Sequence, residues 1–293
     1  MLFRLLRKGT RDVLFMSSVR RYGVQETKLG WRGPMELHCT TTTTRNGSAA
    51  LKQPPRFSLV IPIHNEQDNV NQLLNEVKEV LAPLRPFEVI LVDDGSTDNG
   101  YALACWWKVC HRARWLRILG LQDRVGQSGA VLAGIEAAEA DVVCMMDGDM
   151  QNDPRDLVRM LHMLADDPSL AGVSGMRVDR HDGFVRRVSS RIGNLVRNLL
   201  TGDQVHDSAC GIKAFRRLDV LRAPRFNGMH RFMPTLVRCG GGKVQEIVVK
   251  HRQRANGTAK YGIGNRALRG LKDCFAVRWY RSRALHYRVK EER

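Results

Sequence analysis

The 293-residue sequence predicts an α/β protein built on a mixed, mostly parallel sheet flanked by helices. From residue 57 onward, short apolar runs alternate with stretches in which apolar residues recur at helical spacing. Acidic and polar residues follow directly after several of these runs. The alternation indicates βαβ units, because parallel strands need a long crossover that is usually a helix.

The apolar runs give the expected strands, which cover residues 57–63, 87–92, 116–119 and 142–146. The first strand is followed by a helical pattern that Pro83 ends, and a helix rich in small residues follows Gly126. A further helix is expected over 184–200. No run of 18 or more apolar residues occurs, so the sequence predicts no membrane-spanning helix.

The formal net charge is +17 and the sequence pI is about 10.1. Such a surface attracts nucleic acid, anionic lipid or phosphorylated small molecules, and charge alone does not choose among them. Seven cysteines without a C-x-x-C pair favour a reducing compartment over a disulfide framework or a zinc site. The first strand-helix turn lacks a G-x-G-x-x-G fingerprint, which speaks against an NAD enzyme.

Composition divides the chain into three parts. Residues 1–56 are basic, contain few acids and include a run of five threonines, so we expect a disordered N-terminal extension. A basic amphipathic surface helix and an arginine-rich targeting segment are the alternatives for this stretch. Residues 57–265 form the predicted catalytic domain, which turns basic beyond 175. Residues 266–293 form a basic amphipathic tail that we expect to contact an anionic membrane, and a helix packed back on the core is the alternative.

Acidic residues follow the expected strands at their carboxyl ends, where open parallel sheets bind ligands. Asp147 and Asp149 follow one strand and suit Mg²⁺ or Mn²⁺, since these cations bind one or two carboxylates together with substrate phosphate. Taken alone, each Asp-Gly pattern also suits a simple turn. The occurrence of several acidic clusters along one edge of the sheet favours a functional site.

Four segments carry a resemblance to a known family: SLVIPIHNE at 58–66, VDDGSTD at 92–98, GQSGA at 126–130 and MDGDMQN at 146–152. In this order they resemble the motifs of family 2 glycosyltransferases, and most of all the branch that glycosylates dolichyl or undecaprenyl phosphate. The resemblance extends from residue 57 to about 283. It implies a GT-A, Rossmann-like fold whose nucleotide-sugar half spans 57–175 and whose basic helical acceptor half spans 176–265.

The resemblance also implies roles for individual residues. The nucleotide pocket would be lined by Pro62, Asn65, Glu66, Asp93, Asp94, Asp147 and Arg254. The metal would be held by Asp147, Asp149 and Gln151. The chain departs from the family pattern at Arg124, Gly148 and Asp153, where Asn, Ala and Pro are more usual.

The basic half supplies the groups that the resemblance places on the lipid phosphate, namely Arg177, Arg187 and Ser190. Sequence does not separate Arg187 from Arg186 or Ser190 from Ser189, and a solvated helix face is the alternative. The last motif, HRQRANGTAKY at 251–261, resembles the family's mobile loop. There Arg254 and Lys260 would close over the diphosphate.

An acceptor that is already an anion needs little help from a general base, so we expect catalysis by positioning and electrostatics. The catalytic groups would be Asp149, Arg177, Arg187, Ser190 and Lys260, and the anomeric configuration would invert. The expected partners are a nucleotide-diphosphate sugar (GDP-mannose or a UDP-sugar), a polyprenyl phosphate and an anionic membrane surface. A separate membrane subunit is a further candidate. The predicted location is cytoplasmic, peripheral on the cytoplasmic face of a membrane.

Three alternatives remain at this point. A family 2 enzyme that acts on a saccharide or protein hydroxyl would need a base near Asp207. A basic nucleic-acid-binding protein without enzymatic activity would leave the acidic clusters without a role, and no nucleic-acid partner is expected. A degenerate member that binds nucleotide without turnover conflicts with retention of both predicted metal carboxylates.

Overall fold

The computed structural model describes residues 53–177, 184–253 and 263–285, and the backbone of four short strands nearer the N-terminus. For these four strands, and for residues 184–192 and 263–269, the description extends to the backbone only. The strands are β1 (Arg4–Arg7), β2 (Asp12–Met16), β3 (Thr27–Trp31) and β4 (Leu37–Cys39), and they pair antiparallel in that order. A helix was one alternative for this stretch, and these segments are strands instead. The rest of 1–52 lies outside the described residues, so the disordered extension stays a prediction.

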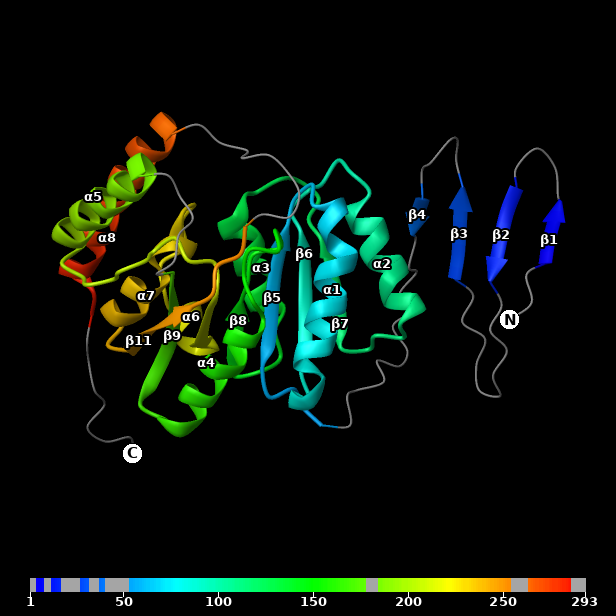
Figure 1. Cartoon of the computed structure of the whole chain (residues 1–293), viewed down its shortest axis with the longest axis horizontal. Coiled ribbons are helices and arrows are strands. Elements are labelled where there is room, and N and C mark those ends of the chain that lie inside the picture. The colour runs from blue at the N-terminus through cyan, green and yellow to red at the C-terminus, as the bar shows by residue number, and fades with distance from the viewer. Residues whose placement is uncertain are drawn as a thin grey trace.

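A seven-stranded sheet in the order β11-β9-β10-β8-β5-β6-β7 forms the centre of the described domain (Figure 1). Its strands are β5 (Ser58–Ile63), β6 (Glu88–Asp93), β7 (Leu116–Gly120), β8 (Val142–Met145), β9 (Leu170–Arg177), β10 (Lys213–Arg216) and β11 (Lys243–Val249). All neighbouring strands are parallel except β10, which runs antiparallel to both β8 and β9. The predicted mixed, mostly parallel sheet is confirmed.

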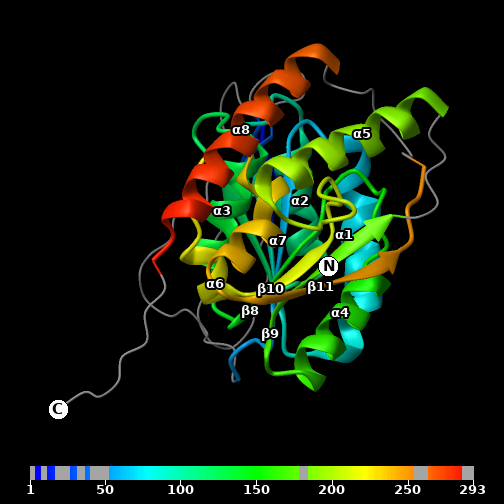
Figure 2. The ribbon, with the colours of Figure 1, turned by 90° about the vertical axis from the view of Figure 1, so that its left-hand side faces the viewer.

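Helices cover both faces of the sheet (Figure 2). One face carries α1 (Gln67–Leu81), α2 (Gly100–Cys110) and α4 (Arg155–Asp166), with the short 3-10 helix η1 (Ala82–Leu84) after α1. The other face carries α3 (Gln127–Ala137), α6 (Arg217–Leu221) and α7 (Met229–Cys239). Beyond these layers, α5 (Phe184–Thr201) and α8 (Ile263–Arg283) pack side by side.

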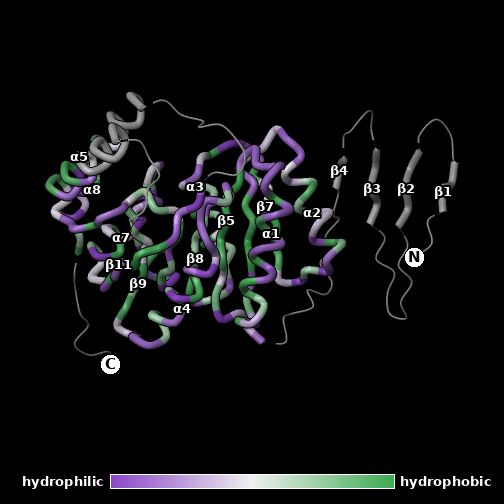
Figure 3. Tube along the Cα trace, in the orientation of Figure 1, coloured by the Kyte–Doolittle hydropathy of each residue, from purple (hydrophilic) through white to green (hydrophobic). Residues whose placement is uncertain are grey.

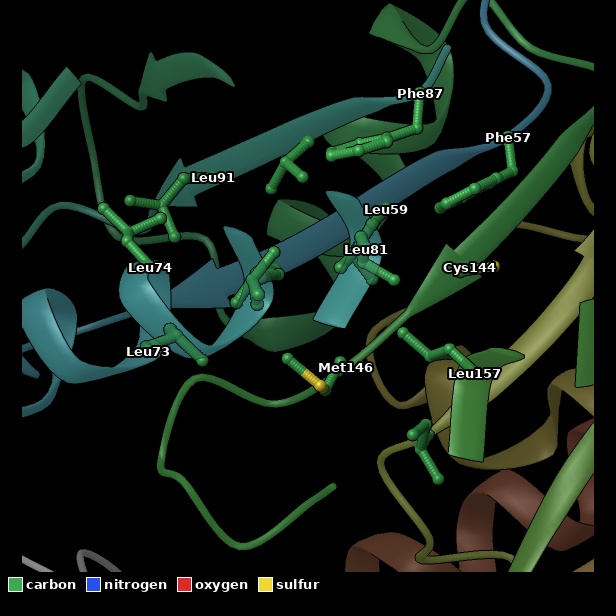
Figure 4. Packing of buried hydrophobic residues seen from close by; sticks show 14 of the residues in the cluster. Phe57, Leu59, Leu73, Leu74, Leu81, Phe87, Leu91, Cys144, Met146 and Leu157 are labelled. Carbon is green, nitrogen blue, oxygen red and sulfur yellow. The ribbon is translucent and has the colours of Figure 1, made fainter. Parts of the chain in front are cut away.

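Burial on both faces explains why the central strands are apolar along most of their length (Figure 3). In β5, Leu59 and Ile61 pack towards α1, whereas Val60 packs towards α3. The first cluster includes the stacked rings of Phe57 and Phe87, whose centroids lie 5.7 Å apart (Figure 4). The core therefore holds the carboxyl ends of β5, β6 and β8 at one edge of the sheet.

The antiparallel strand β10 has a direct consequence for that edge. It is inserted between β8 and β9, so its first residue, Lys213, lies opposite Met145 at the end of β8 and Ser174 near the end of β9. A strand running backwards brings its amino end to the rim where its parallel neighbours finish. The segment 207–213 is thereby delivered to the same rim as Asp147. Within the described residues, no helix is both long and apolar enough to cross a bilayer.

Candidate active site

The loops after β5 and β6 are joined at the rim by hydrogen bonds. The backbone N–H of Asn65 donates to Ser96 Oγ at 2.9 Å, and the N–H of Thr97 donates to Asn65 Oδ1 at 2.8 Å. Asn65 adopts a left-handed backbone with φ of 53°, a conformation that asparagine tolerates better than most residues. Next to it, Glu66 accepts a hydrogen bond from Asn69 at 2.7 Å. The predicted meeting of these polar segments is confirmed.

The two aspartates after β6 lie in different surroundings, although both are buried. Asp94 accepts hydrogen bonds from the backbone N–H groups of Val125 at 2.7 Å and Gly126 at 2.9 Å. It therefore shapes the loop that begins α3, and its contact with a nucleotide stays a prediction. Asp93 accepts one bond from the N–H of Ser96 at 3.2 Å, while its Oδ1 has no hydrogen-bond partner in the described part of the chain. Asp93 thus retains a buried acceptor at the end of β6.

Asp147 and Asp149 lie beyond β8, and the charge of Asp149 acts on Asp147. Burial, and then the negative charge of Asp149, raise the pKa of Asp147 to about 6. Gln127 at the start of α3 donates to Asp147 Oδ1 at 2.7 Å, and Asp149 Oδ1 accepts the backbone N–H of Gln151 at 3.2 Å. Two repelling carboxylates in a half-buried position fit a hard divalent cation, because the cation removes the repulsion that opposes their ionisation.

Gly148, between these two aspartates, lies where a larger side chain would collide with its neighbours. A methyl group at Gly148 would lie 2.7 Å from Ile63 Cγ2 and 3.2 Å from the carbonyl oxygen of Pro62. The loop is therefore packed directly on the end of β5. This contact accounts for glycine at the position where the family resemblance led us to expect alanine, and it joins Pro62 to the predicted metal segment.

The start of the 251–261 motif is joined to the segment that follows Asp149. Asn152 and His251 form an isolated β-bridge, and the N–H of Arg252 donates to the carbonyl oxygen of Gln151 at 2.9 Å. Arg252 also pairs with Asp153 at 2.9 Å, which gives that departure from the motif a structural role. Arg254 and Lys260 lie outside the described residues. No cluster of three or more His, Cys, Asp or Glu side chains forms a metal position within the part of the chain that the structure describes.

Arg177 at the end of β9 is held by Asp207 through two parallel hydrogen bonds. Its Nε donates to Asp207 Oδ2 at 2.7 Å and its Nη2 donates to Oδ1 at 3.0 Å. Lys213 lies opposite both Met145 and Ser174, so Asp147, which follows β8, and Arg177, at the end of β9, lie at the same rim. The positive charge of Arg177 acts to lower the pKa of Asp147. The helix predicted over 184–200 is confirmed as α5, whereas the side chains of Arg187 and Ser190 lie outside the described residues.

Two further polar residues reach this region, and sequence reasoning gave neither of them a role at the site. Lys213 is 4% exposed, and its ammonium group donates a hydrogen bond to the carbonyl of Cys210. His230 Nδ1 and the hydroxyl of Ser128 form a hydrogen bond, with the two atoms 2.6 Å apart. Burial, followed by the charge of Lys213, lowers the pKa of His230 to about 3. His230 is thus a neutral hydrogen-bonding residue, and Cys210 is buried.

Comparison with known proteins identifies the family. Residues 58–221 match the family model described as glycosyl transferase family 2. The chain is a family 2 glycosyltransferase. It is 35% identical over 256 residues to the dodecaprenyl-phosphate galacturonate synthase of Rhizobium johnstonii, a match that covers 85% of this chain and 75% of the relative. It is 30% identical over 216 residues to the undecaprenyl-phosphate 4-deoxy-4-formamido-L-arabinose transferase of Yersinia pestis, covering 73% of this chain and 65% of that protein.

Solved structures establish the fold. The mannosyltransferase PcManGT of Pyrobaculum calidifontis, solved with GDP-Man and Mn²⁺, superposes with a TM-score of 0.52 at 18% identity, covering 78% of this chain and 70% of that chain. Glucosyl-3-phosphoglycerate synthase of Mycobacterium tuberculosis, solved with Mn²⁺, UDP and phosphoglyceric acid, gives a TM-score of 0.59 at 18% identity, covering 78% of each chain. These likenesses show that the family 2 domain has the predicted GT-A fold.

Proposed function

We propose that this glycosyltransferase moves a sugar from a nucleotide-diphosphate sugar onto the phosphate of a polyprenyl lipid, at the cytoplasmic face of a membrane. Two curated relatives are named for polyprenyl-phosphate substrates, which supports this choice of acceptor. The observation that carries the proposal is the arrangement at the rim. Asp147 and Asp149 follow β8 and Arg177 ends β9. Lys213 of the intervening β10 lies opposite Met145 and Ser174, so the two aspartates and Arg177 belong to the same rim of the sheet.

In this proposal the oxygen donors at the end of β8 hold the metal. Asp147 and Asp149 would bind Mg²⁺ or Mn²⁺, with Gln151 beside them, and the cation when bound neutralises charge on the departing diphosphate. Gln127 and Gly211 position the carboxylate of Asp147 from two sides. The donor set is therefore ordered before any substrate arrives.

The end of β6 is proposed to hold the nucleoside. Asp93 supplies a buried acceptor oxygen that is not used within the described residues, which suits an N–H or O–H of the base or ribose. Asn65, Pro62 and Glu66 line the neighbouring loop, while Asp94 fixes the backbone at Gly126. Guanine and uracil both present N–H donors, so this arrangement accommodates GDP-sugars and UDP-sugars alike.

The acceptor phosphate is proposed to lie on the basic side of the rim. Arg177 uses Nε and Nη2 on Asp207, which fixes the plane of the guanidinium and leaves Nη1 directed to other partners. Arg187 and Ser190 on α5 complete the cradle through the family resemblance, and Lys260 and Arg254 close over the diphosphate. A phosphate oxygen held in line would attack the anomeric carbon as the diphosphate leaves, so the configuration inverts.

A membrane-facing surface is proposed on α5 and α8. Cys274 and Val277 of α8 are buried against the core, whereas Leu271, Phe275 and Trp279 recur every four residues on an exposed face. Exposed leucines of α5, Leu195 and Leu199, lie on the neighbouring helix. Basic residues of α8 accompany the apolar ones, a combination that suits an anionic membrane surface. The tail thus packs on the core through one face and remains available for lipid on another.

Screening followed by transfer tests the proposal. Thermal-shift measurements with GDP-sugars and UDP-sugars, each with Mn²⁺ or Mg²⁺, should single out one donor that stabilises the chain only together with the metal. Radiolabel from that donor should then enter polyprenyl phosphate and leave free polyprenol unlabelled. Label in a saccharide or protein hydroxyl, with none in polyprenyl phosphate, would replace the proposal with the other family 2 activity. Hydrolysis alone would also contradict it.

A further inference from the structure

A buried lysine lies at the same rim of the sheet as the proposed metal carboxylates. Lys213 is the first residue of β10, flanked by Met145 of β8 and Ser174 of β9. Its side chain is 4% exposed, and its ammonium donates a hydrogen bond to the carbonyl of Cys210. Burial lowers the pKa of Lys213, and the nearby negative charges of Asp147 and Asp207 act in the opposite direction and favour the ammonium form. Its position at this rim therefore calls for a physical explanation.

The charge of Lys213 acts on the acidic groups of the site. Asp207 is already paired bidentately with Arg177. Asp147 lies against the backbone of Gly211, two residues before Lys213, and the ammonium opposes the rise in the pKa of Asp147 more strongly than Arg177 does. Lys213 thus supplies positive charge beside the carboxylate pair from inside the protein, where water screens it weakly.

We propose that Lys213 is a resident counter-charge that weakens the binding of a bare divalent cation to Asp147 and Asp149 and so makes tight metal binding depend on the nucleotide diphosphate. The inference rests on the proposed function of this site. Two carboxylates and one ammonium leave a single net negative charge, so a bare divalent cation makes the site net positive. An anionic diphosphate reverses that sign, and metal and nucleotide bind cooperatively as a result. Lys213 acts through the field at the carboxylates and is a positioning residue.

Direct metal binding distinguishes this role from a packing role, because the two predict opposite signs. Mn²⁺ affinity of the full chain would be measured by electron paramagnetic resonance of free Mn²⁺, with and without UDP or GDP. Lys213→Met should bind Mn²⁺ at least about tenfold more tightly without nucleotide, and the gain in affinity caused by the nucleotide should shrink by a similar factor. Lys213→Arg keeps the charge and should behave like the wild-type chain.

Lys243→Met is the matched control, because Lys243 is exposed and pairs with Asp167 at 3.0 Å, remote from the carboxylate pair. This variant should leave the Mn²⁺ affinity unchanged, both with and without UDP or GDP. If Lys213→Met does not fold, Lys213→Gln keeps a donor for the carbonyl of Cys210 and gives the same test. A folded neutral variant with unchanged or weaker Mn²⁺ affinity would overturn the inference. Failure of the wild-type chain to bind Mn²⁺ even with UDP or GDP would instead overturn the proposed metal site.

Discussion

The backbone of Gly211 lies so close to Asp147 that a methyl group at position 211 would be 2.0 Å from Asp147 Oδ2. Gly211 belongs to the segment that leads into β10, whereas Asp147 follows β8, so this contact joins the two halves of the site. A side chain at position 211 would displace the carboxylate. The orientation of a proposed metal ligand therefore depends on a glycine 64 positions later in the chain.

Gly211→Ala is expected to reduce glycosyl transfer by about 100-fold, because a displacement of about 1 Å at a reacting centre costs that much. Mn²⁺ affinity should fall together with activity while the thermal unfolding profile stays cooperative. Gly270→Ala is the control, since a methyl group there meets no atom within 4 Å among the described residues. Wild-type Mn²⁺ affinity in Gly211→Ala would show that the contact does not position Asp147.

Metal binding is expected to depend on pH through Asp147, whose pKa is raised to about 6. The carboxyl is protonated below that value and must lose the proton before it can bind a cation. Mn²⁺ affinity should be nearly constant above about pH 7 and fall by about tenfold per pH unit below the pKa. Calorimetry at pH 5.5 in two buffers of different ionisation enthalpy should detect about one proton released per Mn²⁺. Binding without proton release at that pH would contradict the assignment.

Ser128 and His230 should contribute to stability through one hydroxyl group. Ser128 Oγ accepts the N–H of Gly228 at 2.8 Å and forms a hydrogen bond with His230 Nδ1 at 2.6 Å. Ser128→Ala leaves two buried polar groups without this partner and should lower the free energy of unfolding by about 1–3 kcal/mol. Urea denaturation measures this loss. Ser169→Ala is the control. It removes an exposed hydroxyl and should change the free energy of unfolding by less than about 0.5 kcal/mol.

The same pair gives a pH dependence of stability. The pKa of His230 is lowered from 6.5 to about 3 in the folded protein, so the unfolded chain binds the proton more tightly. The contribution of this site to the free energy of unfolding is complete above about pH 6.5 and declines as the pH falls below it. Long-range proton-nitrogen NMR spectra should show His230 as a neutral ring between pH 5 and 8. A titration midpoint near 6.5 would contradict the buried hydrogen bond.

The exposed face of α8 should carry the affinity for anionic lipid. Phe275 and Trp279 are 54% and 66% exposed, and replacing both with serine should lower binding to anionic vesicles by about 10- to 100-fold. Trp106→Ser is the matched control, because Trp106 is 54% exposed on α2, away from this face. Vesicle flotation measures both variants. Equal losses in the two would indicate non-specific adsorption, and no loss in either would remove the proposed membrane surface.

Local patterns were sufficient to predict the first half of the fold. The strands expected at 57–63, 87–92, 116–119 and 142–146 are found as β5, β6, β7 and β8, and the helices after the first strand and after Gly126 are α1 and α3. Each is encoded by a short apolar run or a helical repeat. The insertion of β10 between β8 and β9 could not be predicted in this way, since antiparallel pairing of segments about 70 residues apart leaves no local signature.

The candidate site likewise has features that the sequence predicted and features that only the fold shows. The acidic residues at the strand ends do meet at one rim, as their positions after parallel strands predicted. Sequence alone could not show that the carboxylate of Asp94 accepts hydrogen bonds from the backbone N–H groups of Val125 and Gly126. Nor could it show that Arg177 is paired with Asp207. Lys213 was overlooked because a lone lysine at the start of a strand is normally exposed. Only the position of β10 between two strands makes it buried.

The most direct test of the account is glycosyl transfer by Asp149→Asn, which preserves the volume of the side chain and its bond to the N–H of Gln151 while removing the charge. With the donor selected by screening and with polyprenyl phosphate as acceptor, transfer should fall by at least about 1,000-fold, since one of two carboxylates on the cation is lost. Asp141→Asn, at the opposite end of β8, should retain full activity. Wild-type transfer by a folded Asp149→Asn protein would contradict the central claim that these two aspartates hold the metal on which the reaction depends.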